Sequence, residues 1–90
     1  MKGTYSEMLR FAIFSNQKSL EDIAMDLRQY GFKTNKSQLS KLQNGKILPA
    51  SNKMNDALAE ILNIDSLELK AAAYKEKIPP EILNKIKEIC

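Results

Sequence analysis

The side chains best suited to chemistry lie together in the middle of the chain, in residues 35–49, NKSQLSKLQNGKILP. The first part of this segment has helical character, but it carries only two large apolar residues, Leu39 and Leu42. Its other side chains are lysines, hydroxyls and amides. Lysine pairs with the acceptors of guanine, amides pair with adenine, and hydroxyls pair with either base. The composition of this segment therefore favours contact with nucleic acid.

Acidic residues are absent between Asp26 and Asp56. The outer faces of helices usually carry Glu and Lys in i, i+4 pairs, so a polar face without acids is unusual. The positive charges in this interval are Arg28, Lys33, Lys36, Lys41, Lys46 and Lys53. The chain carries a net charge of only +3, so its centre is basic and its flanks are mildly acidic. A local field of one sign attracts a polyanion, although a solvated lysine-rich surface is the simpler alternative.

Residues that commonly perform catalysis or bind metals are scarce. The chain has no His, and its only cysteine is Cys90. It also has no glycine-rich phosphate loop and no cluster of carboxylates. We therefore expect no enzymatic activity, no cofactor and no metal site. We expect Cys90 to be an exposed thiol, with an intermolecular disulfide as the alternative.

Targeting signals are also missing from the sequence. The N-terminus, MKGTYSEMLR, has no hydrophobic signal segment. No apolar run approaches the roughly 20 residues that a membrane span needs. A lone cysteine fits a reducing compartment. We expect a soluble, cytoplasmic protein that does not enter a membrane.

Helices must position the central side chains, because no segment keeps the period of two that is typical of a strand. Ninety residues suit one domain. We expect an all-α fold with helices over roughly residues 5–16, 20–30, 35–43, 53–62 and 66–74. The candidate N-caps are Thr4 or Ser6, Ser19, Thr34 or Asn35, and Ser51 or Asn52. The expected core residues are Met8, Leu9, Ala12, Ile13, Leu20, Ile23, Ala24, Leu27, Phe32, Leu39, Leu42, Met54, Leu58, Ile61 and Leu62, with Leu67, Leu69 and Ala71 to Ala73 offered by the last helix.

The helical pattern is interrupted at Ile78-Pro79-Pro80, because proline does not suit a helix interior. We place a boundary here between a main domain, residues 1–77, and a C-terminal extension, residues 78–90. The spacing of apolar residues in the extension predicts a short helix with an apolar stripe of Ile82, Leu83, Ile86 and Ile89. This stripe either forms a dimer contact or packs on the core of its own monomer.

Several short motifs follow one another in a recognisable order. Residues 39–45, LSKLQNG, run hydrophobic, Ser, basic, hydrophobic, polar, any, Gly. Ile23-Ala24 precedes them, and Pro49, Leu62-Asn63-Ile64, Leu67 to Tyr74 and Ile78-Pro79 follow. Over about residues 5–80, this ordered set resembles the Cro/CI-type, lambda-repressor-like helix-turn-helix family of phage repressors and bacterial transcriptional regulators.

The resemblance implies a compact five-helix domain that binds double-stranded DNA and represses transcription. Its recognition helix, about residues 35–43, would enter the major groove. The positions that match base-reading residues are Lys36, Ser37 and Lys41, and Ser40 would reach base or backbone. Asn44 and Lys46 match residues that contact phosphate. To these we add Lys33 and Lys53 for less specific attraction, and Ser19 at the amino end of the second helix.

Three positions depart from the family pattern. Leu20 stands where the family often has a Gln that contacts phosphate and supports the recognition helix. Gly31 lies eight residues before Leu39 instead of six, so helix two or the turn is longer. Gln43 replaces an acid. These departures keep a second function open, in which the chain is a non-enzymatic protein-interaction module, such as an accessory protein or an antirepressor. The expected partners are therefore DNA, a second copy of the chain, or a regulatory protein.

Overall fold

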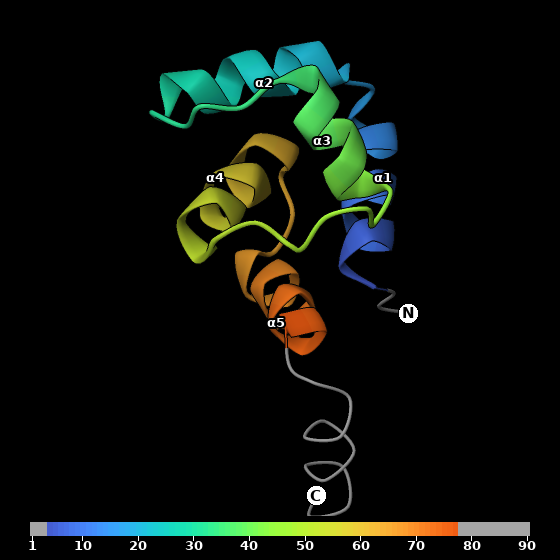
Figure 1. Cartoon of the computed structure of the whole chain (residues 1–90). Coiled ribbons are helices and arrows are strands. Elements are labelled where there is room, and N and C mark those ends of the chain that lie inside the picture. The colour runs from blue at the N-terminus through green and yellow to red at the C-terminus, as the bar shows by residue number, and fades with distance from the viewer. Residues whose placement is uncertain (1–3, 78–90) are drawn as a thin grey trace, which may run out of the picture.

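The computed structural model describes residues 4–77, and this part of the chain contains five α-helices and no strand. The helices are α1 (Tyr5–Asn16), α2 (Leu20–Gln29), α3 (Lys36–Gln43), α4 (Asn52–Leu62) and α5 (Ser66–Lys77). They confirm the predicted all-α class, and their bounds follow the predicted ranges closely, except that α5 continues beyond Tyr74. Figure 1 shows α3 crossing in front of α1, with α2 above and α4 and α5 beside and below.

The beginning of each helix is fixed by a side chain that accepts a hydrogen bond from a free backbone N–H. At α1, Thr4 Oγ1 accepts from the Glu7 N–H, and Glu7 Oε1 accepts from the Thr4 N–H at 2.9 Å. This reciprocal pair is a capping box. Ser19, Asn35 and Ser51 cap the next three helices, and Asp65 accepts from the first turn of α5. Of the alternative N-caps that the sequence predicted, Thr4, Asn35 and Ser51 are the ones used.

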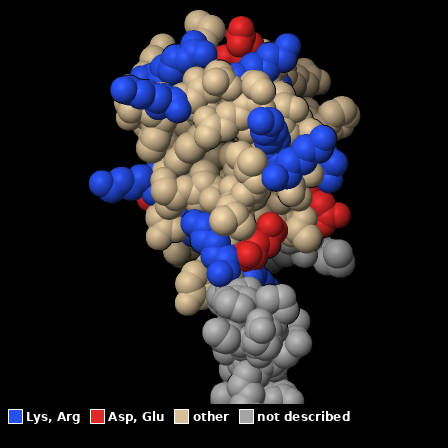
Figure 2. All heavy atoms as spheres, viewed as in Figure 1, with Lys and Arg blue, Asp and Glu red and all other residues tan. Residues whose placement is uncertain are grey.

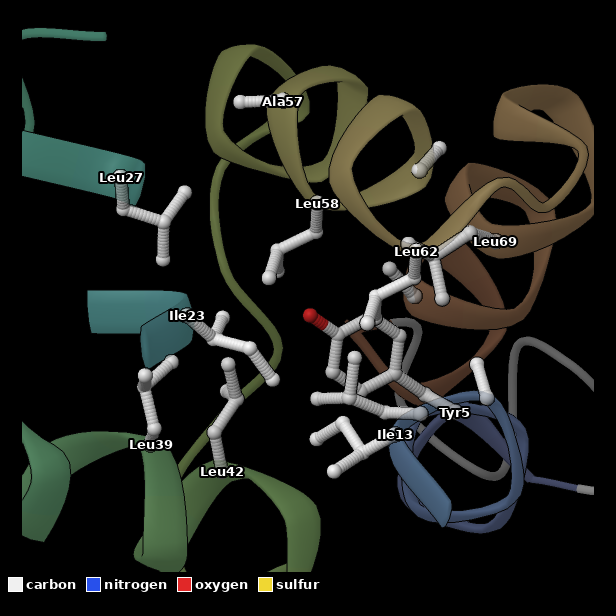
Figure 3. Close-up of a cluster of buried hydrophobic side chains, with 14 of the residues drawn as sticks. Tyr5, Ile13, Ile23, Leu27, Leu39, Leu42, Ala57, Leu58, Leu62 and Leu69 are labelled. Carbon is white, nitrogen blue, oxygen red and sulfur yellow. The ribbon is translucent and has the colours of Figure 1, made fainter. Parts of the chain in front are cut away.

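A single cluster of buried apolar side chains joins all five helices (Figure 3). Its largest members are Tyr5, Leu9, Ile23, Leu27, Leu39, Leu58, Leu62 and Leu69. Most of the predicted core residues belong to this cluster or pack against it. The expectation for α5 was partly wrong, because Leu67 is 72% exposed and Ala71 is exposed. The other three residues expected from this helix, Leu69, Ala72 and Ala73, are buried as predicted.

A polar pair lies inside this apolar cluster. The Tyr5 hydroxyl donates to Asn55 Oδ1 at 2.6 Å, and both residues are fully buried. The Asn55 amide donates in turn to the carbonyl of Ala50 at 3.0 Å. Burial is the main reason that the pKa of Tyr5 rises from 10.0 to about 12. The pair ties α1 to α4 and to the loop between α3 and α4.

The connection between α2 and α3, residues 30–35, is held by side chains of both helices. Arg28 Nε donates to the Thr34 carbonyl at 3.3 Å, and the Thr34 hydroxyl donates to Gln38 Oε1 at 3.1 Å. Gly31 has a φ of +93°, which allows the chain to reverse after α2. Phe32 packs partly against the core, as expected. The two helices pack on each other across this connection.

The C-terminal extension, with the predicted stripe of Ile82, Leu83, Ile86 and Ile89, lies outside the described residues. Within residues 4–77, no helix combines the length and the apolar composition needed to span a membrane.

Candidate nucleic-acid interface

An open groove of about 420 Å³ runs along the outer side of α3, next to the first turn of α2. We call it the α2–α3 groove. It is lined by Leu20, Lys36, Ser37, Ser40, Lys41, Asn44 and Lys46. The structure therefore brings all the predicted base-reading residues together with Asn44 and Lys46, which were predicted to contact phosphate.

The orientation of α3 follows from its two leucines. Leu39 and Leu42 are 1% and 3% exposed and hold one side of the helix against the core. With 3.6 residues per turn, the side chains of Lys36, Ser37 and Lys41 then project from the other side. All three are exposed. Two apolar residues are thus enough to leave the rest of the helix available for a ligand.

The lysines of the α2–α3 groove have no carboxylate partner among the described residues. Two lysines elsewhere in this part of the chain are paired, since Lys18 lies 3.0 Å from Asp26 and Lys70 lies 2.8 Å from Asp56. Figure 2 shows Lys and Arg side chains spread over the viewed face, with only small areas of Asp and Glu between them. The groove therefore offers lysines that form no ion pair with an acidic side chain of residues 4–77.

The hydroxyl and amide groups of the groove are also largely available. Ser40 is half-buried, and its Oγ accepts only a long hydrogen bond, 3.5 Å, from the Asn44 amide. Asn44 itself is exposed at the end of α3, where Gly45 takes a φ of +70°. These groups can exchange their present contacts for a ligand at little cost.

The other predicted phosphate ligands do not line the groove. Ser19 is exposed beside it, but its hydroxyl already accepts from the Asp22 N–H at 3.1 Å. Glu21 and Asp22 occupy the same first turn of α2, and their carboxylates oppose a phosphate there. Lys33, in the connection, and Lys53, in the first turn of α4, are exposed but do not line the groove.

The groove contains one residue that the sequence did not assign to it. Leu20 appeared in the sequence only as the loss of a phosphate-binding Gln. The structure places Leu20 both in the wall of the groove and against the core. Its apolar character and its position at the start of α2 were visible in the sequence, but its contact with α3 depends on the packing of the two helices.

A second groove, about 380 Å³, lies beside α1 and is lined by Arg10, Ile13, Phe14, Gln17, Lys18 and Gln43. We call it the α1 groove. Phe14 is 80% exposed, and Phe11, one turn earlier, is 72% exposed. Single exposed apolar side chains are common, but neighbouring aromatic ones often mark a binding surface.

Comparison of the chain with protein-family models, with curated proteins and with solved structures gives no match. Among residues 4–77, no three His, Cys, Asp or Glu side chains are grouped as metal ligands would be.

Proposed function

We propose that this protein is a sequence-specific DNA-binding transcription regulator, acting most simply as a small repressor. The observation that carries the proposal is the α2–α3 groove, where Lys36, Ser37 and Lys41 converge on one exposed surface without a carboxylate among the described residues. Such donors fit the acceptor-rich major groove of DNA, which has room for an α-helix.

In this proposal, α2 and α3 act as a helix-turn-helix pair. The exposed side of α3 enters the major groove, where Lys36, Ser37, Ser40 and Lys41 read base edges. Asn44 and Lys46, at the end of α3, bind phosphates and fix the register on the duplex. Binding is consequently salt-dependent. Occupied DNA would then exclude RNA polymerase.

The order of the five helices supports placing the domain in the lambda-repressor-like family, as the sequence motifs suggest. The main departure lies in the connection between α2 and α3. Arg28 and Thr34 hold this longer connection in place through hydrogen bonds, so the added length does not leave α3 loosely attached. The tilt of α3 in the major groove would differ from the family's usual one.

A homodimer would give this small domain its selectivity. One module of this size buries only about 600–1,000 Å² on DNA. Two-fold dimers read two half-sites about one helical turn apart. We propose that the sequence stripe of Ile82, Leu83, Ile86 and Ile89 provides the contact between the two copies, with packing on its own monomer as the alternative.

A second candidate function is supported by the α1 groove. There the exposed Phe14 lies beside Arg10, and the exposed Phe11 precedes Phe14 by one helical turn, a combination that suits a protein partner with apolar and acidic side chains. In that case the chain would be a protein-interaction module, such as an accessory protein or an antirepressor, with weak or no DNA binding.

The test is selection from a random duplex library by the purified protein, followed by affinity measurements on the enriched site. We expect an enriched motif, and we expect Lys36→Ala, Ser37→Ala and Lys41→Ala each to weaken binding to it. Lys75→Ala, an exposed lysine of α5, is the matched control and should bind normally.

Failure of a folded protein to enrich any site at low salt would contradict the DNA-binding proposal. The combined change of Phe11→Ala and Phe14→Ala tests the alternative. If that variant loses the biological activity while the α3 variants retain it, the protein-interaction function is favoured.

A further inference from the structure

One apolar side chain lies among the polar ones of the α2–α3 groove. Leu20 is the first residue of α2, and all six other residues that line the groove are polar or charged. Leu20 is half-buried and packs against the core, so its position in the wall is fixed. Any ligand that fills the groove must place some chemical group against this leucine.

A phosphate is a poor match for that position. An apolar side chain cannot replace the hydrogen bonds that phosphate oxygens make with water. The nearby end of α2 is also unfavourable, because Glu21 and Asp22 are negative and the Ser19 hydroxyl is used as the N-cap. The group that meets Leu20 should therefore be apolar and uncharged.

Among the groups that DNA presents in the major groove, the C5-methyl of thymine is the apolar one. We infer that Leu20 contacts the methyl group of a thymine in each half-site, and so acts as a specificity-determining residue. The inference rests on the proposed DNA-binding function. Thymine also presents its O4 acceptor, and the donors of Ser37 and Lys41 line the same groove. One base thus satisfies both the apolar and the polar parts of this surface.

The test removes the methyl group alone. Each thymine of the enriched site is replaced in turn by deoxyuridine, which lacks only that methyl, and the affinity is measured for each duplex. At one thymine in each half-site, the replacement should lower the affinity of the native protein for the duplex about fourfold. This is the effect expected for burying one methyl group.

Variants of Leu20 then link the effect to this residue. Leu20→Ala should weaken binding to the thymine-containing site and should no longer distinguish thymine from deoxyuridine at that position. Leu20→Met keeps the apolar volume and should retain the distinction. Thermal unfolding of both variants verifies that they are folded at the temperature of the measurement.

Two results would overturn the inference while leaving the DNA-binding function intact. One is an enriched site in which no thymine depends on its methyl group. The other is a deoxyuridine effect that persists unchanged in folded Leu20→Ala. Failure to enrich any site would instead remove the DNA-binding function itself, and with it this inference.

Discussion

At the scale of single residues, two lysines of the α2–α3 groove differ in position, and the proposed function gives them different roles. Lys41 projects from the middle of α3, whereas Lys46 follows its end, in the loop after Gly45. If α3 lies in the major groove, Lys41 faces base edges and Lys46 faces the phosphate backbone. Base contacts give sequence preference, whereas phosphate contacts give position and salt dependence.

We therefore expect different responses to the same substitution. Lys46→Ala should weaken binding about equally on the enriched site and on random DNA, and should lower the slope of log K against log salt by about 1. Lys41→Ala should cost about 1–3 kcal/mol on the enriched site and relax the preference for one base. Fluorescence anisotropy over a range of salt concentrations measures both quantities. Equal behaviour of the two variants on both DNAs would contradict the separate roles.

At the scale of elements, the Tyr5–Asn55 pair joins three parts of the fold. It links the first residue of α1, the first turn of α4 and the loop before α4. A buried hydrogen bond contributes modestly to stability when it is made, but a buried group left without a partner costs about 1–3 kcal/mol. The pair therefore affects stability chiefly through the cost of removing one partner, which leaves the other buried without a hydrogen bond.

The raised pKa of Tyr5, about 12 instead of 10.0, predicts a dependence of stability on pH. The folded state holds this proton more tightly than the unfolded state. The contribution of protonated Tyr5 to the stability of the folded state is thus complete below pH 10 and is lost as the pH rises toward 12. Two pKa units correspond to about 2.7 kcal/mol, an order-of-magnitude figure.

Urea unfolding between pH 8 and pH 12 tests this dependence, with Tyr5→Phe as the control for the titration of lysines. Tyr5→Phe should be less stable at pH 8 by about 1–3 kcal/mol, because the Asn55 carbonyl loses its donor. Its stability should then fall less steeply above pH 10. Parallel curves for the two proteins would show that Tyr5 does not carry the effect.

The helices themselves were predictable because their signals are local. Ser19, Asn35 and Ser51 cap the helices that follow them, and the leucines of α3 fix its orientation through helical periodicity. Lys36, Ser37 and Lys41 could therefore be assigned to one exposed face from the sequence alone. Their availability to a ligand also follows from the absence of acids between Asp26 and Asp56.

What escaped prediction depends on contacts between distant residues. From the sequence alone, Asn55 would be expected on the surface because it is polar. It is instead buried, where it accepts a hydrogen bond from Tyr5, which is 50 positions away. Leu67 was misassigned because α5 has apolar residues on opposite sides, and only packing decides which side is covered. The place of Leu20 in the wall of the α2–α3 groove was also not predicted, because it depends on how α2 packs on α3.

At the scale of the whole molecule, the proposed dimer depends on the stripe of Ile82, Leu83, Ile86 and Ile89. The sequence offers the stripe of residues 82–89 either to a second copy or to its own monomer. The combined change of Ile82→Asp and Ile86→Asp separates the two. If the stripe joins two copies, the variant should be monomeric in sedimentation measurements, should keep its thermal stability at low concentration, and should bind single half-sites only.

If the stripe packs on its own core, the same variant should melt at a lower temperature without a change in oligomeric state. Lys85→Asp, in the same segment but off the stripe, is the control and should alter neither property. A variant that behaves like the native protein in both measurements would contradict both roles of the stripe.

The N–H of Tyr5 donates to Glu76 Oε2 at 2.7 Å, so the two ends of the described chain are joined. During synthesis, α1 is the first of the five helices to emerge from the ribosome and α5 is the last. While the ribosome is still adding α4, α1 can pack on α3 but still lacks α5, so the complete core forms only after α5 has emerged. A product of premature termination before α5 would expose apolar surface and invite proteolysis or aggregation. The folded domain should therefore form only from chains that include α5.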